Sequence, residues 1–272
     1  MNLAAGTVLK SADRDLTLLS RIEDAGLNAS APPQQRWVDG WLVRFCPGKA
    51  KRARCINAVA MGRLSLAEKL ALCRAIYHET GLQMLVRITP FSQPAGLDAQ
   101  LATLGMRRED DTRVMVRPVG LPSSPRLPLG LRLDRLGHHA FAELIGSLRG
   151  SSLAQRQAHA ARLEQSPVPF HGFALVGDSG VAMACGQVAL EGGIVGLYDI
   201  FTAADHRRRG FAALLCSQLL RYALQHAAPV SYLQVEADNH AARRVYHRLG
   251  FADAFAYHYR TPAVDSEIDA LD

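Results

Sequence analysis

The sequence lacks any long apolar run, which excludes one broad class of proteins. No stretch of its 272 residues reaches the roughly 18 consecutive apolar residues that a membrane-spanning helix needs. The first residues, Met1–Leu9, have neither a basic start nor a long apolar core, so we expect no signal peptide and a cytoplasmic location. With 49% hydrophobic and 21% charged residues, the composition also excludes a disordered or collagen-like chain.

Cysteine is scarce as well. The chain has five cysteines, an odd number, and none of them forms a C-x-x-C pair. We therefore expect buried free thiols in a reducing compartment rather than a disulfide framework. The histidines include no pair four residues apart with a carboxylate, the spacing typical of a zinc site on a helix, so we expect no metal.

The net charge of +6 lies entirely in the first half of the chain, where residues 1–122 carry 17 Lys and Arg against 11 Asp and Glu. Part of this excess is the basic run from Lys49 to Arg54, which could attract an anionic ligand or nucleic acid. No aromatic residue is interleaved with these side chains for base stacking. We therefore interpret the run as a solvated loop and expect no nucleic-acid binding.

A proline-rich segment divides the chain into two halves of similar length. Residues 117–128 contain four prolines and two serines, which cannot continue a helix or a central strand. A chain of 272 residues is about twice the commonest domain size, which agrees with two domains. We predict domains at 1–120 and 129–262, a linker at 121–128 and an acidic tail at 263–272.

The second half alternates helices and strands in the way typical of a mixed α and β domain. Two good turn sequences, Gly177–Gly180 and Glu191–Gly193, join three strands into an expected antiparallel meander. The expected strands are Leu129–Leu133, Phe170–Val176, Val181–Leu190, Ile194–Thr202, Val230–Glu236 and Phe255–Arg260. The expected helices are His138–Leu148, Ser152–Glu164, Phe211–His226 and Ala241–Leu249.

The first half repeats this pattern in a weaker form. It predicts strands at Trp37–Phe45, Arg54–Val59, Met84–Ile88 and Thr112–Arg117, and helices at Leu66–Thr80 and Leu97–Leu104. Both halves end in a strand, a helix, a Leu-Gly-hydrophobic sequence and a last strand. The glycines of that sequence, Gly105 and Gly250, are 145 residues apart. The pattern indicates two copies of one unit.

The most informative segment is Thr202–Ala212, between an expected strand and the start of a long expected helix. The first turn of a helix has backbone N–H groups without intrahelical partners and a partial positive charge, which suits a phosphate. Gly210 lets the backbone approach such a ligand closely, and Ala212 leaves the first turn free of bulk. Forked cationic side chains, which suit phosphates, precede the glycine at Arg207, Arg208 and Arg209.

A second motif begins at Asn239, directly after the expected strand Val230–Glu236, and includes Ala242, Tyr246 and the sequence Leu249–Phe251. Together the two motifs resemble those of the GNAT superfamily of acyl-CoA-dependent N-acetyltransferases. Arg207-x-x-Gly210-x-Ala212 is similar to the Q/R-x-x-G-x-G/A pyrophosphate loop of that family. The resemblance covers residues 129–260.

The resemblance implies an α/β (α+β) fold of two tandem GNAT-like domains, each a mixed, mostly antiparallel twisted sheet flanked by helices. The segment Asp39–Phe45 and the basic run after it are similar to the N-terminal part of double-domain members. In the first copy, however, the segment entering the helix is Ala60–Ser65, which has no arginine loop. We therefore expect the first domain to be degenerate, without cofactor binding, and acetyl-CoA to bind the second domain alone.

The family pattern also implies a role for each matching residue. The backbone of the strand before the loop would bind the pantetheine arm, the N–H groups from Arg208 to Ala213 would bind the pyrophosphate, and Asn239 would bind the cofactor arm. Tyr246 would protonate or hydrogen-bond the leaving thiolate, unless it only packs on its helix face. The implied cofactor-binding residues are Ile200, Phe201, Thr202, Arg207, Arg208, Arg209, Gly210, Phe211, Ala212, Ala213, Asn239 and Tyr246.

The implied reaction is direct attack of a neutral amine on the thioester in a ternary complex, with backbone N–H groups stabilising the oxyanion. A base or a water chain must accept the amine's proton. Where some family members have a glutamate on the following strand, this chain has Gln234. The remaining candidates are Asp199, Tyr198, Glu191 and Glu236, of which we favour Asp199.

Three questions stay open at the level of sequence. Because no convincing base is present, the chain could instead be a non-catalytic module that binds or senses acyl-CoA. The amine acceptor is also not defined, since the segment from His138 to Pro169 that would wall its site permits an apolar or an acidic acceptor. The oligomeric state is likewise undetermined.

Overall fold

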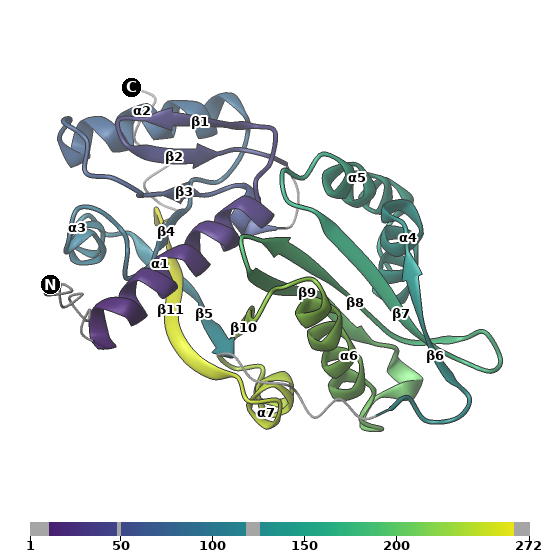
Figure 1. Cartoon of the computed structure of the whole chain (residues 1–272). Coiled ribbons are helices and arrows are strands. Elements are labelled where there is room, and N and C mark those ends of the chain that lie inside the picture. Colours follow the sequence, from purple (N-terminus) through teal and green to yellow (C-terminus); the bar gives the residue numbers. More distant parts are fainter. Residues whose placement is uncertain (1–10, 48–49, 118–125, 264–272) are drawn as a thin grey trace, which may run out of the picture.

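Strand β5 (Arg107–Arg117), the last strand of the first half of the chain, lies between two strands of the second half. It pairs antiparallel with β10 (Val230–Glu236) on one side and with β11 (Ala252–Thr261) on the other. The computed structural model describes residues 11–47, 50–117 and 126–263, and in these ranges a single sheet runs through both halves (Figure 1). Residues 264–272 of the expected tail and residues 121–125 of the expected linker lie outside the described residues.

The remaining strands flank this central group. They are β1 (Gln35–Val38), β2 (Trp41–Arg44), β3 (Ile56–Asn57), β4 (Val86–Ile88), β6 (Leu131–Leu136), β7 (Phe170–Gly177), β8 (Ala182–Glu191) and β9 (Ile194–Thr202). The strand order is β1-β2-β3-β4-β11-β5-β10-β9-β8-β7-β6. Only β3–β4 and β9–β10 pair in parallel, so the sheet is mixed and mostly antiparallel, as the sequence predicts.

Seven α-helices of the described chain cover both faces of the sheet, with two short 3-10 turns, η1 and η2, between elements (Figure 1). The helices are α1 (Ser11–Ala29), α2 (Leu66–Glu79), α3 (Leu97–Thr103), α4 (His138–Leu148), α5 (Leu153–Glu164), α6 (Phe211–Gln225) and α7 (His240–Arg248), and the turns are η1 (Lys51–Ala53) and η2 (Ala204–His206). Helix α1 is absent from the sequence prediction, although Leu18, Ile22, Ala25 and Ala29 have the spacing of one helix face.

The two faces of the second-half sheet are covered by different helices. On the first face, α6 and α7 pack on β7–β10 through buried side chains such as Leu215, Leu219 and Tyr246. On the second face, α4 and α5 pack through Phe141, Ile145 and Leu163, while α1 packs against Tyr232 and Ile194.

The centre of the sheet is symmetric about the β11–β5 pair. In the chain, β4, α3 and β5 follow one another, as do β10, α7 and β11, and in the sheet the order is β4-β11-β5-β10. Gly105 and Gly250 occupy matching positions after α3 and α7, with φ angles of 75° and 86°. The predicted tandem arrangement therefore takes the form of two units that interleave their last strands in one sheet, instead of forming two separate sheets.

Most other differences from the sequence prediction concern element ends. The expected strand Trp37–Phe45 is a hairpin, because Asp39 and Gly40 both have positive φ and turn the chain between β1 and β2. The five cysteines are free, and all except the half-buried Cys46 are buried, as predicted. Within the described residues, no helix is both long and apolar enough to cross a membrane.

Candidate functional site: a strand divergence leading into a glycine turn

Strands β9 and β10 run side by side for only part of their length. They pair in parallel from Ile194 to Leu197, and the partner of Leu197 is Leu233. Beyond that point β9 continues along β8 to Thr202, while β10 continues along β5. The edge of β9 from Tyr198 to Thr202 therefore faces away from any strand partner in the described chain, and its backbone N–H and C=O groups can bind an extended ligand.

A β-bulge marks the start of this divergence. The β8–β9 register shifts between Cys185 and Gln187, and Asp199 on β9 has φ of 52°. Because of the extra residue, Tyr198 and Phe201 both pack on the second face, whereas Ile200 packs on the first. The bulge also directs the Asp199 carboxylate toward α5.

Three side chains hold that carboxylate. Asp199 accepts hydrogen bonds from Arg149 Nη1 at 2.9 Å and Gln187 Nε2 at 2.7 Å, and His159 Nε2 lies 3.4 Å away. Burial alone would raise the pKa of Asp199, but His159 and Arg149 outweigh it and hold the pKa well below its usual range. A carboxylate stabilised in this way is a weak base, which argues against the proton-accepting role expected from the sequence.

The segment from Thr202 to the start of α6 forms a turn with a suitable shape for an anion. Arg208 and Gly210 have φ of 61° and 84°, the left-handed conformation that turns successive N–H groups toward one side. All three arginines are exposed; Arg207 Nε lies 3.4 Å from the Thr202 carbonyl and its guanidinium is 5.7 Å from the Phe201 ring centre. A Cβ atom at Gly210 would meet nothing within 4 Å, so space for a ligand exists there.

The second motif forms the start and the inner face of α7. Asn239 is the N-cap: its Oδ1 accepts the N–H of Ala242 at 3.1 Å, which leaves its amide N–H groups for a ligand. Tyr246 is buried against α6, with its ring 6.1 Å from that of Phe251. Burial raises the pKa of Tyr246, and Cys216 adds to this effect, so the hydroxyl stays protonated at neutral pH.

The other expected bases lie in different places. Tyr198 is on the second face, where its hydroxyl is 2.6 Å from that of Tyr232. Glu191 is at the far end of β8, and its Oε1 accepts a hydrogen bond from Asn28 of α1 at 2.7 Å. Glu236 is exposed at the end of β10.

The sequence analysis missed three residues of this region: His159, Arg162 and Gln187. His159 and Arg162 lie one helical turn apart on α5, and the pKa of Arg162 responds to the charges of Asp199 and Arg52. Gln187 is fully buried opposite the bulge. The spacing of His159 and Arg162 on α5 is visible in the sequence, but the bulge that brings Asp199 to them is not.

The first unit has a different structure at the corresponding helix. Helix α2 follows β3 in the same way as α6 follows β9. The backbone N–H groups before α2, however, already bind a carboxylate of the chain itself. Asp39 accepts the N–H groups of Arg63 at 2.9 Å and Leu64 at 2.8 Å, and it forms an ion pair with Lys69 at 3.1 Å. These backbone hydrogen bonds hold the pKa of Asp39 below its usual value. This arrangement agrees with a first unit that has no cofactor site.

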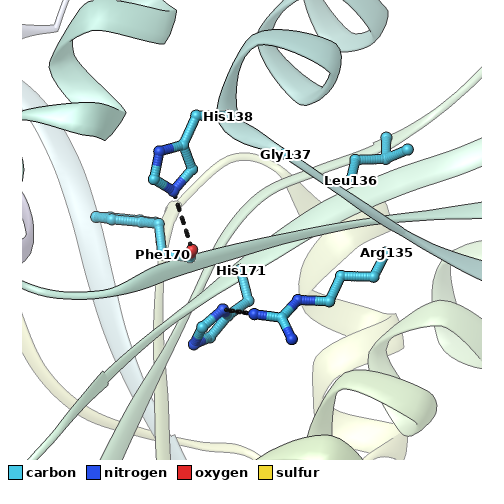
Figure 2. Close-up of a pocket in the computed structure, with 6 residues that line it drawn as sticks. All are labelled: Arg135, Leu136, Gly137, His138, Phe170 and His171. Atoms are coloured by element: carbon cyan, nitrogen blue, oxygen red, sulfur yellow. Dashed lines mark hydrogen bonds between the residues drawn. The ribbon is translucent and has the colours of Figure 1, made fainter.

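A pocket of about 410 Å³ lies away from the divergence, where β6 ends and β7 begins. Figure 2 shows Arg135 reaching toward His171, at 2.7 Å, while His138 points to the carbonyl of Phe170. His171 also contacts Tyr222 near the C-terminal end of α6, whereas the candidate anion-binding turn is at its N-terminal end. Among the described residues, no group of three or more His, Cys, Asp and Glu side chains could hold a metal.

Comparison with known proteins gives a consistent assignment. Residues 19–260 match the family described as "Probable histone acetyltransferase Rv0428c C-terminal". One relative, described as "Uncharacterized N-acetyltransferase YobR" of Bacillus subtilis (strain 168), is 26% identical over 232 residues, which cover 83% of this chain and 91% of that protein.

Two solved structures share the fold. The GCN5-related N-acetyltransferase from Kribbella flavida aligns with a TM-score of 0.67 at 18% identity, over 90% of this chain and 95% of its own. A tandem GNAT protein from the clavulanic acid biosynthesis pathway aligns with a TM-score of 0.61 at 18% identity, over 72% of this chain and 68% of its own. The chain therefore belongs to the family described as "Probable histone acetyltransferase Rv0428c C-terminal", and it has the fold of GNAT-type proteins, a tandem one included.

Proposed function

We propose that this protein transfers an acetyl group from acetyl-CoA to a primary amine of a small molecule or peptide, by direct attack within a ternary complex. The observation that carries the proposal is the divergence of β9 from β10 directly before the anion-binding turn at α6. An extended thioester cofactor needs both features: an unpaired strand edge for its amide-containing arm and a ring of N–H groups for its phosphates.

The cofactor would bind the second unit in an orientation set by these two features. The backbone of Ile200, Phe201 and Thr202 would hold the pantetheine arm. Backbone N–H groups of the turn and of the first turn of α6 would bind the pyrophosphate, together with the cationic side chains of the three arginines. These residues are Arg207, Arg208, Arg209, Gly210, Phe211, Ala212 and Ala213. The amide of Asn239 would donate to the cofactor arm from the start of α7.

In the reaction, the amine nitrogen forms a bond to the thioester carbon, and the carbon–sulfur bond then breaks. Backbone N–H groups at the divergent part of β9 would stabilise the oxyanion that forms between these two steps. Tyr246 would donate its proton to the leaving thiolate, since its burial keeps the hydroxyl protonated. No covalent enzyme intermediate is needed.

The proton lost by the amine requires a different route from the one expected from the sequence. Asp199 is a weak base because Arg149 and His159 stabilise its charge. We assign it a positioning role at the bulge. The hydroxyl pair of Tyr198 and Tyr232, 2.6 Å apart on the second face, would act as a relay: each hydroxyl releases its own proton as it accepts one, and water takes the last proton to bulk solvent.

A calorimetric titration with acetyl-CoA tests the proposed cofactor site. We expect one site per chain in the wild type and loss of binding in Gly210→Glu, because a carboxylate would occupy the phosphate position. The matched control is Gly105→Glu: Gly105 has a similar φ, 75° against 84°, and equally open surroundings, but lies in the first unit.

Three other outcomes of this titration would change the proposal. No binding by the wild type would contradict the proposal, and two sites per chain would contradict a degenerate first unit. Tight binding without turnover of any amine would favour the alternative function, a module that binds or senses acyl-CoA.

A further inference from the structure

We propose that the amine acceptor carries an anionic group, a carboxylate or a phosphate, which the guanidinium groups of Arg162 and Arg52 bind on the second face of the sheet. This inference rests on the proposed function and specifies its substrate class. The sequence left the choice between an apolar and an acidic acceptor open.

The geometry first defines the face from which the acceptor must approach. On the first face, the region beside the divergence is filled by Phe211, Leu215 and Tyr246, which are buried in one core cluster. On the second face, the bulge presents Tyr198, Asp199 and Phe201. A cofactor arm in the divergence is thus closed off by α6 and α7, and the amine must reach the thioester from the second face.

Arg162 lies on α5 one helical turn after His159, whose Nε2 is 3.4 Å from the Asp199 carboxylate, so it borders this region. It is partly buried, and within the described ranges no carboxylate, carbonyl or hydroxyl bonds to its guanidinium. Loss of water lowers the pKa of Arg162, Asp199 raises it and Arg52 lowers it further. None of the guanidinium nitrogens of Arg162 is a fully buried atom without a partner, so they stay accessible to a ligand, and a partly buried guanidinium of this kind suits an anion.

Arg52 approaches the same region from the first unit. Its guanidinium donates to Gln234 Oε1 and lies 5.8 Å from the centre of the Tyr198 ring. The groups next to it are thus an amide and an aromatic face, and neither neutralises its charge. Arg52 belongs to the basic run that the sequence analysis interpreted as a solvated loop, and the structure places this side chain against the sheet instead.

The balance of charge in the region favours an anion. Asp199 is the carboxylate that acts on Arg162, and it is already held by Arg149 at 2.9 Å and His159 at 3.4 Å. Among the described residues neither Arg52 nor Arg162 forms an ion pair, so both have positive charge available to a ligand. Guanidinium groups bind carboxylate and phosphate with paired hydrogen bonds, which makes an acceptor with one of these groups the best complement.

The two arginines would also change the pKa of the acceptor's amine. Positive charge near an ammonium disfavours its protonated form and lowers its pKa. An acceptor anchored by its anionic group would therefore present more of its amine in the neutral, reactive form. This effect reduces the need for a strong base, which the described residues near the bulge do not provide.

The test compares amines that differ in the group at their other end. The probes are ω-amino carboxylates of two to six carbons, aminoalkyl phosphates, n-alkylamines and α,ω-diamines of matched length. We expect the anionic amines to have at least about tenfold higher kcat/KM than the alkylamines, equal to about 1.4 kcal/mol, and the diamines to be the poorest. Comparing the two anionic series identifies the carboxylate or the phosphate as the preferred group.

Arg162→Gln should raise KM for the preferred anionic amine about tenfold or more, with little change in kcat or in acetyl-CoA affinity. Arg221→Gln is the matched control, since Arg221 is an exposed arginine on helix α6. Arg52→Gln supplies a second variant if Arg162→Gln is unstable. Equal use of alkylamines and amino carboxylates by the wild type would overturn the inference, as would an Arg162→Gln variant that loses both activities equally.

A binding measurement separates this inference from the proposed function. The preferred anionic amine is titrated into protein saturated with CoA, which requires no turnover. Binding that is lost in Arg162→Gln, without any turnover in the wild type, would support the anion site and contradict the enzymatic function. Turnover of alkylamines, with no binding preference for anionic amines, would support the function and contradict the anion site.

Discussion

At the scale of single residues, Tyr246 and Asp199 differ in what surrounds them. Tyr246 is buried among apolar side chains of α6 and α7, and burial raises its pKa. Asp199 is buried among cations, and His159 and Arg149 lower its pKa despite that burial. Both groups therefore keep their ordinary charge state at neutral pH, which suits Tyr246 as a proton donor and makes Asp199 a poor proton acceptor.

We expect Tyr246→Phe to lower kcat by roughly a hundredfold, the usual contribution of a general acid, and to leave the Kd for acetyl-CoA nearly unchanged. The phenyl ring keeps the packing against Phe251 and removes only the proton donor. Steady-state kinetics and calorimetry on the same preparation measure the two effects. Tyr222→Phe is the control, because Tyr222 packs on Phe173 elsewhere along α6. An unchanged kcat in Tyr246→Phe would show that the tyrosine only packs.

Asp199→Asn should leave the acidic limb of the pH profile of kcat/KM in place. The lowered pKa of Asp199 means that its carboxylate is ionised throughout the range from about pH 5 to 9, so its titration cannot produce that limb. Asparagine tolerates the positive φ at this position. Tyr198→Phe is the comparison variant, and we expect it to have the larger effect on kcat. A limb that disappears in Asp199→Asn would restore the carboxylate as the base.

At the scale of secondary structure elements, α3 of the first unit is tied to β11 of the second by one carboxylate. Asp98 accepts hydrogen bonds from Arg260 Nε and His258 Nε2, each at 2.7 Å. The hydrogen bond from Arg260 is the largest cause that lowers the pKa of Asp98 to about 2. This contact lies between the two units, so it contributes to their association.

Asp98→Asn should therefore destabilise the protein in a pH-dependent way. The folded pKa is about 2 and the unfolded one about 3.9, so the contribution is present above about pH 5 and is lost as pH falls toward 2. The carboxylate side chain is 40% exposed, and after discounting for solvent screening we expect about 1 kcal/mol at pH 7.

Urea unfolding of the wild type and Asp98→Asn at pH 7 and pH 3 measures this difference in the free energy of unfolding. The exposed Asp178→Asn is the control. A difference between the wild type and Asp98→Asn that grows on acidification would contradict the assigned ion pairs.

At the scale of the whole molecule, the two units depend on each other because β5 and β11 are interleaved. Residues 112–116 of β5 pair both with β10 and with β11, so β5 completes the sheet of the second unit. In return, β11 pairs with β4 of the first unit. Removing either half would leave open strand edges in the other.

We expect a fragment of residues 126–272 to be insoluble or unable to bind acetyl-CoA, because β10 and β11 lose their shared partner. Supplying residues 1–117 as a separate chain should restore binding. As a control, the full chain cut at a protease site introduced between residues 118 and 125 should remain assembled and active. Size-exclusion chromatography and acetyl-CoA titration distinguish these cases, and a fragment that folds and binds alone would refute the dependence.

Local features of this protein were accessible from the sequence. The ends of α4, β9 and β10 agree with the predicted ranges, since hydrophobic periodicity and turn residues act over a few neighbours. The turn at Arg207–Gly210 and the cap at Asn239 were accessible for the same reason. Helix α1 could have been predicted from its apolar spacing, and its omission was an error of interpretation.

Only the tertiary structure decided which distant groups meet. The pairing of β5 with β11 joins segments more than 130 residues apart, and the bulge at Asp199 depends on the register between β8 and β9. The charge state of Asp199 and the electrostatic surroundings of Arg52 and Arg162 depend on burial and on charged residues that belong to other elements. By itself, the sequence determined most of the elements, the turn before α6 and the family motifs, because backbone preference and helix capping are local. The strand exchange between the units and the electrostatics of the second face are products of long-range packing.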